Sequence, residues 1–378
     1  MFFDKKKSES APYPEVLLVH EWLERDGGAE KVLDSLVEIF LNPRILTLWN
    51  DDKNRYKDCN VNETFLRLFP RKIRKIISIP LMPFVWRLQK TSKYRTVVIS
   101  SHLFAHHIRA INAKKFVYVH SPARYIWEPT IDTRGNNLIS KFFAFFLKKI
   151  DYVRAQEAHS LAANSKYVAL RILNNWGREA RVIYPPVNAH RISKIKDWNI
   201  KLSQNDKTIF ENLPNRFIVG ASRLVSYKKI REVLRVAELT GIPAVIVGTG
   251  PEYSNLKSLA KQMKVQTFFL GRVSDEMLYA IFQKALFLVF PAVEDFGIIP
   301  VEAMAAGCPV LGNITGGVSE SVIDGKTGYL TDFRNDKEIQ ELALKIQDID
   351  SSECIRRAEY FDSRRFKTEI VHWLQNEF

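Results

Sequence analysis

The stretch LFLVFPAVEDFGIIPVEAMAAGCPVLG, residues 286–312, holds two apolar runs separated by a turn and a helical segment. The first run, 286–291, has the uninterrupted apolar character of a strand that is buried on both faces, as in a parallel sheet. Pro300 is tolerated in the first turn of a helix, so a helix is predicted to begin near Ile298. With a second strand at 309–312 the segment forms a βαβ unit, which predicts an α/β fold.

The same alternation continues on both sides of this unit. Strands are predicted at 16–20, 44–49, 96–100, 116–120, 161–165, 181–184, 216–222, 243–248, 266–271, 286–291, 309–312 and 328–330. We expect two domains, 1–190 and 200–355, because 378 residues exceed the usual size of one. Pro185-Pro186 and a polar stretch near 186–213 predict a linker between them. The amphipathic stretch 353–378 predicts a closing helix, of which 360–378 can return to the first domain.

Two glutamates, Glu294 and Glu302, flank the predicted helix start. Glu294 follows its strand at the carboxyl end, which is where open α/β sheets bind ligands. The free N–H groups at Gly297, Ile298 and Ile299 suit a phosphate. Glu302 lies where it can accept hydrogen bonds from paired hydroxyls, such as a ribose diol. The alternative is two solvated glutamates beside a helix; we favour a ligand site because strand, glycine and helix start agree.

Positive charge is expected at the same end of the sheet. Arg223 and Lys228 follow a predicted strand around a helix start, where a planar guanidinium and an ammonium suit a diphosphate. A solvated basic loop is the alternative. Arg272 and Val273 follow another strand, and their backbone is placed to contact a base.

One glycine-rich turn fails a familiar fingerprint. The segment GTGPEY, 248–253, resembles G-x-G-x-x-G, but Tyr253 stands where the third glycine is required. This absence argues against an NAD-dependent dehydrogenase, the enzyme class that two Rossmann-like domains would otherwise suggest.

As a set these motifs resemble those of the family 4 glycosyltransferases with the GT-B fold, in their mannosyltransferase-like branch. The matching segments are Glu294…Glu302 as the E-x7-E motif, SRLVSYK (222–228), GCPVLGNITGGVSESVIDGKTGYL (307–330), VHEWLERDGGAEKVL (19–33) as the Gly-Gly loop, and YVHSPARYIWEP (118–129) as the His-x-Pro region. Residues 50–95 and 190–212 are poorly covered by the resemblance.

The resemblance implies two Rossmann-like domains facing across a cleft that holds a nucleotide-diphosphate sugar. It also implies transfer with retention of the anomeric configuration, without a metal or a cofactor. Arg223 and Lys228 would neutralise the diphosphate and the charge that develops on the leaving group. Glu302 would hold the ribose. Glu294 and the backbone from Phe296 to Ile298 would hold sugar hydroxyls.

In the first domain the resemblance implies that Gly27 and Gly28 let a helix N-terminus approach the phosphate or the acceptor closely. His120 would lie near the reacting sugar, whereas a structural histidine at a strand end is the alternative. GDP-mannose is the implied donor, with a UDP-sugar second. The acceptor would be a glycan or a lipid-linked molecule in cell-surface polysaccharide or glycolipid synthesis.

The net charge of +14 is concentrated in the first half, where 31 basic side chains face 18 acidic ones over residues 1–190. The window 64–127 holds 13 Lys and Arg and no Asp or Glu. Within it, residues 65–90 mix basic with large apolar side chains, which is typical of a segment on an anionic membrane surface. A core helix pair with snorkelling charges is the alternative. A nucleic-acid-binding protein is a further alternative, although no recognisable motif supports it. We do not expect a nucleic acid as a partner.

Other features exclude several classes. The three cysteines, Cys59, Cys308 and Cys354, are far apart, which argues against a disulfide framework or a zinc site. No apolar run reaches the ~18–20 residues of a membrane-spanning helix, and the N-terminus lacks the apolar core of a signal peptide. We therefore expect a cytoplasmic enzyme that rests on the inner face of the membrane.

Overall fold

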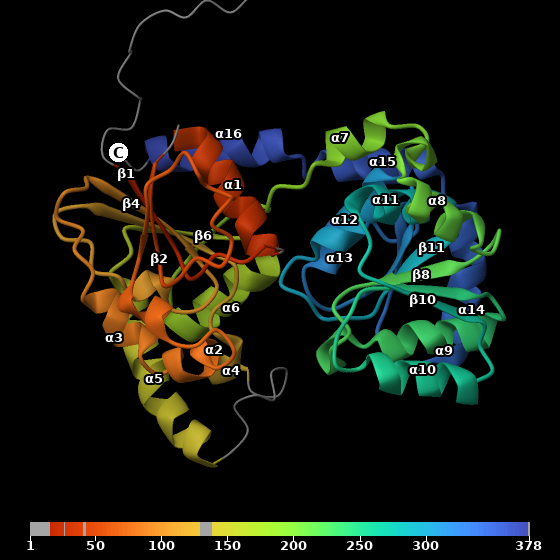
Figure 1. Cartoon of the computed structure of the whole chain (residues 1–378), viewed down its shortest axis with the longest axis horizontal. Coiled ribbons are helices and arrows are strands. Elements are labelled where there is room, and N and C mark those ends of the chain that lie inside the picture. Colours follow the sequence, from red (N-terminus) through yellow and green to blue (C-terminus); the bar gives the residue numbers. More distant parts are fainter. Residues whose placement is uncertain (1–15, 26, 41–42, 129–137, 377–378) are drawn as a thin grey trace, which may run out of the picture. The chain divides into compact units, whose positions relative to one another are not determined.

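A computed structural model describes residues 16–25, 27–40, 43–128 and 138–376 (Figure 1). The N-terminal residues 1–15 lie outside the described part. The chain forms two compact units. Unit 1 comprises the described residues up to Asn164, then Val168–Ile183 and the residues from Lys367 onward; unit 2 comprises Ser165–Tyr167 and Tyr184–Phe366.

Unit 1 is built on a parallel sheet of seven strands in the order β3-β2-β1-β4-β5-β6-β7. The strands are β1 (Val16–His20), β2 (Arg44–Thr47), β3 (Val61–Glu63), β4 (Thr96–Ser101), β5 (Lys114–Val119), β6 (Ser160–Ala163) and β7 (Arg181–Val182). The central strands are buried on both faces, as expected for a sheet covered by helices on each side. The order changes direction between β1 and β4, so their carboxyl ends form the switch point of this sheet.

Helices cover both faces of this sheet. They are α1 (Gly28–Phe40), η1 (Phe65–Leu68), α2 (Arg74–Ser78), α3 (Met82–Arg87), η2 (Ala105–His107), α4 (Arg124–Trp127), α5 (Leu138–Gln156), α6 (Lys166–Trp176) and α16 (Ser363–Asn376). Figure 1 shows α1 and α16 along one face and α3, α5 and α6 along the other. Among the helices of the described residues, none is both long and apolar enough to span a bilayer.

Unit 2 is built on a parallel sheet of six strands in the order β10-β9-β8-β11-β12-β13. The strands are β8 (Ile218–Ala221), β9 (Ala244–Val247), β10 (Thr267–Gly271), β11 (Phe287–Phe290), β12 (Val310–Asn313) and β13 (Gly328–Thr331). Its switch point lies between β8 and β11. Two parallel sheets confirm the predicted α/β class, and each predicted strand has its counterpart.

Two separate cores cover the two faces of this second sheet. The helices are α7 (Ala189–Lys194), η4 (Trp198–Lys201), α8 (Gln204–Glu211), η5 (Ser226–Lys228), α9 (Ile230–Thr240), α10 (Tyr253–Gln262), α11 (Asp275–Lys284), α12 (Ile298–Ala305), α13 (Val318–Ser321), α14 (Asp336–Lys345), η6 (Ile346–Asp348) and α15 (Ser351–Glu359). Figure 1 shows α9, α10 and α14 on one face and α11, α12 and α15 on the other.

Local chemistry explains where these helices begin and end. In α9 the buried Ile230, Val233 and Leu234 recur at helical spacing, and Gly241 ends the helix with a φ of 67° that favours glycine. In α11 the Ser274 hydroxyl accepts a hydrogen bond from the Met277 N–H, which satisfies a donor of the first turn.

The predicted linker near 186–213 is wrong, because this stretch folds as α7, η4 and α8. Trp198 is fully buried and packs its ring 4.9 Å from that of Tyr279. Ser203 caps α8 by accepting from the Asp206 N–H at 3.2 Å. A buried aromatic anchor, further buried apolar residues such as Ile192, and side-chain caps therefore order a stretch whose composition is that of a linker.

Two further predictions need correction. The stretch 353–378 holds two helices, α15 and α16, instead of one, because Asp362 stands between them and accepts from the Arg364 N–H at the start of α16. The strand β3 was not predicted; it has three residues at the edge of the sheet, too few for an alternating pattern to be visible.

Candidate active site

The switch point of unit 2 brings two of the predicted site residues into contact. The chain leaves β8 through Ser222–Lys228 and leaves the neighbouring β11 through Pro291–Gly297. There the Lys228 ammonium forms an ion pair with the Glu294 carboxylate. Both side chains keep part of their surface exposed, 14% and 21% respectively. The pair is therefore partly desolvated and still open to a ligand.

Arg223 lies on the same loop but is held differently. Its guanidinium donates to the Tyr227 hydroxyl at 2.6 Å, and the residue is exposed. Arg223 therefore shares a loop with Lys228 but does not contact Glu294 through a hydrogen bond or an ion pair. An exposed guanidinium with a single neutral partner of this kind can turn toward a phosphate without leaving a buried charge behind.

Two glycines fix the backbone around Glu294. The Gly317 N–H donates to the Glu294 carbonyl at 2.8 Å. A Cβ at Gly316 would lie 2.7 Å from the same carbonyl oxygen, and Gly316 has a φ of 99°. A Cβ at Gly317 would lie 2.4 Å from the Asp295 carbonyl oxygen. The loop after β12 therefore packs directly on the Glu294 backbone, which only glycine allows.

The helix predicted after this turn is present as α12. Gly297 occupies the N-cap with a φ of 88°, and the helix begins at Ile298. Phe296 points into the core, 5.5 Å from the Phe361 ring, so only its backbone is available to a ligand. The N–H groups of the first turn, including Ile299, have no intrahelical partner and are the donors that an anion would use.

Glu302 lies one turn into α12 and is 3% exposed. Its charge is felt by Tyr279, whose pKa is raised first by burial and then by Glu302. The carboxylate thus lies deeper than Glu294, against a buried tyrosine, where a hydrogen bond to a ligand hydroxyl would be strong because little water competes.

The loops after β8 and β9 are joined by backbone contacts at this end of the sheet. Gly248, with a φ of 131°, approaches so closely that a Cβ would lie 1.8 Å from the Ser222 carbonyl oxygen. Its N–H donates to the Gly271 carbonyl at 2.7 Å. Arg272 and Val273 follow directly, Arg272 exposed and Val273 half-buried. The glycines of GTGPEY therefore serve close backbone packing.

In unit 1 the predicted glycine loop is already occupied by a carboxylate. α1 begins at Gly28, and a Cβ at Gly27 would lie 1.8 Å from the Glu30 Oε2. Glu30 also accepts from the Glu24 N–H at 3.1 Å, and burial raises its pKa. An anionic ligand can approach this helix start only if Glu30 turns away or is protonated.

His120 lies at the carboxyl end of β5 and is linked to the switch point through a serine. The Ser100 hydroxyl lies 2.8 Å from His120 Nε2 and 3.1 Å from His20 Nδ1. Burial lowers the pKa of both histidines, that of His20 to about 4, so both rings are neutral at pH 7. His20 Nε2 is buried and has no hydrogen-bond partner among the described residues.

Next to His20 lies Glu21, a fully buried carboxylate that was not predicted from the sequence. It accepts from the backbone N–H groups of His102, Leu103 and Ala105 at 2.8–3.2 Å and from the Ser101 hydroxyl at 3.2 Å. Burial alone would raise its pKa, but the nearby histidines and these donors outweigh it, and the pKa lies below its usual value.

The Glu21 carboxylate also holds the ring of His102, whose Nδ1 lies 3.2 Å from Oε2. His102 keeps a quarter of its side chain exposed. A buried carboxylate that orients a partly exposed imidazole is a common arrangement at functional sites. One signal was available: polar residues, His20-Glu21 and Ser100-Ser101-His102, stand at the carboxyl ends of two otherwise apolar strands.

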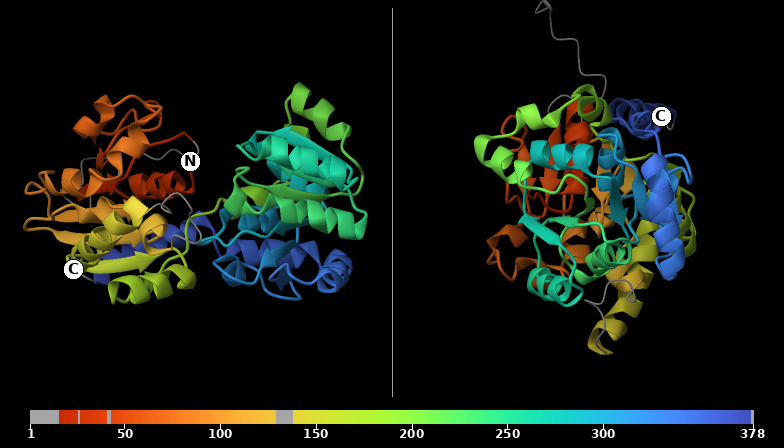
Figure 2. Two further views of the ribbon diagram at one scale, coloured as in Figure 1. Left: turned by 90° about the horizontal axis from the view of Figure 1, so that it is seen from below. Right: turned by 90° about the vertical axis from the view of Figure 1, so that its right-hand side faces the viewer.

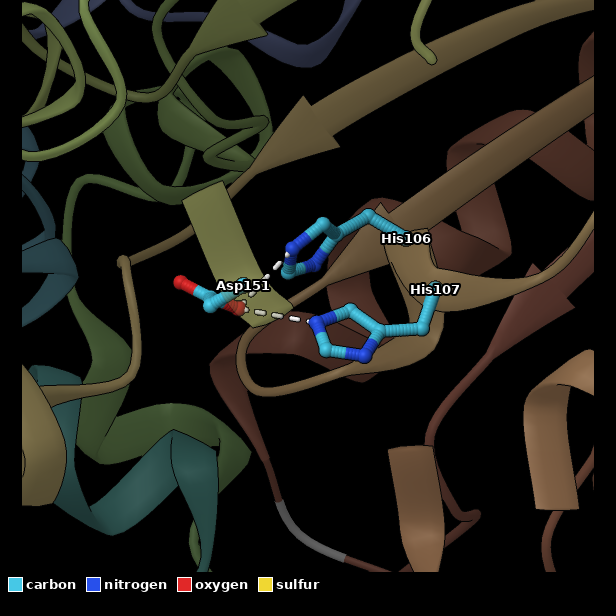
Figure 3. Close-up of side chains that lie close together, drawn as sticks. All are labelled: His106, His107 and Asp151. Carbon is cyan, nitrogen blue, oxygen red and sulfur yellow. Dashed lines mark hydrogen bonds and ion pairs between the residues drawn. The ribbon is translucent and has the colours of Figure 1, made fainter. Parts of the chain in front are cut away.

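A second buried carboxylate, Asp151, lies between His106 and His107 (Figure 3). Its Oδ1 is 2.9 Å from His107 Nε2 and 3.0 Å from His106 Nε2, while Oδ2 accepts from the indole N–H groups of Trp127 and Trp176 at 2.7 Å. Two imidazoles and a carboxylate are a donor set that zinc accepts. Here hydrogen bonds already satisfy both oxygens, so the cluster ties together η2, α4, α5 and α6.

Comparisons with known proteins agree with this geometry. Residues 203–360 match the family model of the glycosyl transferases group 1. The chain is 27% identical over 137 residues to N-acetyl-alpha-D-glucosaminyl L-malate synthase from Bacillus anthracis, covering 35% of this chain and 36% of that protein. It is 26% identical over 257 residues to the alpha-1,3/1,6-mannosyltransferase ALG2 of Rhizomucor pusillus, covering 58% and 55%.

Over the whole chain the fold has solved counterparts. HepE from Anabaena, crystallised with UDP-glucose, superimposes with a TM-score of 0.71 at 20% identity, over 96% of this chain and 100% of that one. The sequence relatives quoted above are matched over about a third to a half of their length. The chain therefore has the GT-B fold, and residues 203–360 of its second unit match a glycosyl transferases group 1 domain.

Proposed function

We propose that the chain is a retaining, metal-independent glycosyltransferase. It transfers mannose from GDP-mannose to a glycan or lipid-linked acceptor, in the synthesis of a cell-surface polysaccharide or glycolipid. The observation that carries this proposal is the Lys228–Glu294 pair beside the start of α12, at the switch point of the group 1 domain. A cation, a helix start and two carboxylates there match the parts of a nucleotide-diphosphate sugar.

The ion pair suggests how the donor is bound. Within the protein itself Glu294 neutralises Lys228. A diphosphate carries more negative charge than one carboxylate, so it takes over Lys228 and attracts Arg223. Glu294 is then released to accept hydrogen bonds from the hydroxyls of the sugar, together with the backbone of Phe296–Ile298. Both cations also stabilise the charge that grows on the diphosphate as it leaves.

The nucleoside part of the donor is bound by Glu302 and by the backbone at Arg272 and Val273. Glu302 accepts from the ribose hydroxyls, in an environment where a charged hydrogen bond is strong. The backbone at Arg272 and Val273 contacts the base. Because backbone groups pair with the edge of a base, this contact decides between guanine and uracil, and a UDP-sugar remains the alternative donor.

Unit 1 supplies the acceptor side. His120 is neutral at pH 7 and contacts the hydroxyls of the transferred sugar, while the Ser100 hydroxyl links its ring to the buried His20. His102, oriented by Glu21, positions the acceptor. Mannose is supported by the ALG2 relative, whose name describes a mannosyltransferase. The basic half places the enzyme at the inner face of an anionic membrane, where a lipid-linked acceptor lies.

A thermal-shift screen against GDP, UDP, GDP-mannose and UDP-glucose tests the proposal. A ligand at 100 times its Kd stabilises the folded state by about 2.7 kcal/mol, so the midpoint should rise with GDP and GDP-mannose. The variant Lys228→Met should lose the shift, and Lys326→Met, an exposed lysine elsewhere in unit 2, should keep it. A larger shift with UDP would move the donor to a UDP-sugar, and no shift with any nucleotide would refute the glycosyltransferase.

A further inference from the structure

The segment 65–88 of unit 1 is apolar on its inner and its outer side. Leu66, Met82, Val85 and Trp86 face the core and are buried. The outer side carries six large apolar side chains that are 46–76% exposed: Phe65, Leu68, Ile73, Ile76, Phe84 and Leu88. We call these six the apolar patch. Figure 2 shows η1, α2 and α3, in orange, at the periphery of unit 1.

The side chains on this outer side are unusually apolar for a helix surface that faces solvent. A helix on a globular protein normally shows charged or polar residues to solvent. In unit 2 the exposed large apolar side chains lie singly, as Leu344 does on α14. Six within 24 residues mark an interaction surface.

The charged side chains within this segment are all basic. Arg67, Arg71, Lys72 and Lys75 are exposed between and beside the apolar residues, and we call them the basic fringe. No acidic residue occurs between Glu63 and Glu128. Three of the four cations reach acids outside that window, as Lys75 does with Glu24 at 2.5 Å. Exposed apolar side chains interleaved with exposed cations match the acyl chains and phosphates of an anionic bilayer.

The patch connects directly to the polar network of unit 1. The Lys75 ammonium lies 5.0 Å from the centre of the Trp22 ring. The Trp22 ring in turn stands edge-on to His102, with their centres 4.6 Å apart. One side chain therefore separates the basic fringe from the imidazole that is held by Glu21.

We propose that the apolar patch and the basic fringe dock unit 1 on an anionic lipid bilayer, so that an acceptor anchored in that bilayer reaches His102 past Trp22. This inference deepens the proposed function: it rests on that function for the acceptor's role, whereas the docking itself does not depend on sugar transfer. The buried inner side of the segment fits the alternative of a core helix pair. The exposed outer side is the part that binds lipid.

Cosedimentation with vesicles tests the docking. Phosphatidylcholine vesicles are compared with vesicles that also contain phosphatidylglycerol, at low and high salt. We expect at least about 10-fold stronger partitioning to the anionic vesicles at low salt. Replacing both Ile76 and Leu88 by Ser should weaken it by about 10-fold or more, because two inserted side chains are lost. Leu344→Ser, equally exposed on unit 2, should change nothing.

A second pair of variants separates charge from apolar insertion. Lys72→Gln should weaken binding to the anionic vesicles about 5-fold at low salt and hardly at all at high salt. Lys326→Gln is its matched control. Should the Ile76/Leu88 variant fail to fold, Leu68→Ser on η1 replaces it. Equal binding to both vesicles, no binding, or unchanged binding by the patch variants would overturn the proposal.

Two other outcomes would also overturn it. The patch would belong to a protein interface if sedimentation velocity showed self-association that Ile76→Ser abolishes. It would belong to a nucleic-acid site if the fringe variants lowered salt-sensitive oligonucleotide binding and left vesicle binding intact. The thermal shift with GDP, measured on the same variants, reports on the donor site alone. Loss of vesicle binding with an intact GDP shift, or the reverse, therefore shows which proposal has failed.

Discussion

The two units place polar residues at the same point of the same fold and treat them differently. In unit 1, Glu21 is enclosed and accepts hydrogen bonds from backbone groups and a serine of the chain itself. In unit 2, the Glu294 side chain is partly exposed and has one ionic partner, Lys228. Its backbone packs directly against two glycines, Gly316 and Gly317. A carboxylate saturated by its own chain holds the fold and the neighbouring His102 ring in place, whereas one with a single exchangeable partner can bind a ligand directly.

The distribution of charge follows the same division. The first half of the chain carries nearly the whole excess of +14, and the patch that we assign to lipid lies there. The group 1 domain is close to neutral, and of its two cations at the site Lys228 is paired with a carboxylate, whereas Arg223 donates to the neutral Tyr227 hydroxyl. The variants below test whether one carboxylate serves the fold and the other the ligand.

The largest effect is expected from Glu21→Ala. It leaves the buried N–H groups of residues 102–105 without their acceptor and removes the carboxylate beside the His102 ring, so the free energy of unfolding of unit 1 should fall by about 3–5 kcal/mol. Urea unfolding followed by tryptophan fluorescence measures this, because six of the seven tryptophans lie in unit 1. Glu294→Ala is the matched control and should stay within about 0.5 kcal/mol. Equal losses in both variants would erase the contrast.

The second prediction concerns Lys228→Met. Removing a cation that faces the developing negative charge should lower kcat by about 100- to 1000-fold. Release of GDP from GDP-mannose measures the rate, and the unfolding midpoint should not move. Lys326→Met, exposed and outside the site, should keep the wild-type rate. An equal fall in stability and rate would make Lys228 a structural residue.

The third prediction is that the protein unfolds at a lower temperature at pH 5 than at pH 7. Burial lowers the pKa of His20 and of His107 from 6.5 to about 4, so their contribution to stability is complete above pH 6.5 and is lost as the pH falls toward 4. Full loss would amount to roughly 3 kcal/mol per histidine. Thermal melts of tryptophan fluorescence at pH 7 and pH 5 should show a lower midpoint at pH 5, and the variant His107→Gln should reduce this difference. A midpoint that does not depend on pH would contradict the prediction.

The smallest effect is expected from Glu302→Gln. A neutral amide keeps the shape of the side chain but accepts a weaker hydrogen bond, so GDP affinity should fall about 10-fold while stability is unchanged. Calorimetric titration with GDP measures the change, and Glu341→Gln on α14 is the exposed control. If Glu302 mattered only to the core, the unfolding midpoint would fall and the affinity of the folded fraction would not.

Local patterns predicted the part of the site that is local. The strand, turn and helix of 286–312 lie within one βαβ unit, so Glu294, Gly297 and the start of α12 were visible in sequence. The partnership of Glu21 with residues 102–105 spans some 80 positions and follows from the strand order, which no local pattern encodes. The supposed linker failed for a related reason, because burial of Trp198 depends on the distant Tyr279.

The helix α16 has a consequence for the order in which the protein is made. Trp373 is buried in unit 1, where its indole N–H donates to Ser160 at 2.9 Å and its ring meets Phe116. Ile370 and Leu374 are also fully buried. On the ribosome, the sheet of unit 1 emerges first but lacks this helix until all of unit 2 has been synthesised. The N-terminal unit therefore completes its core last, and a released chain truncated after residue 366 should carry a folded unit 2 beside an unfinished unit 1.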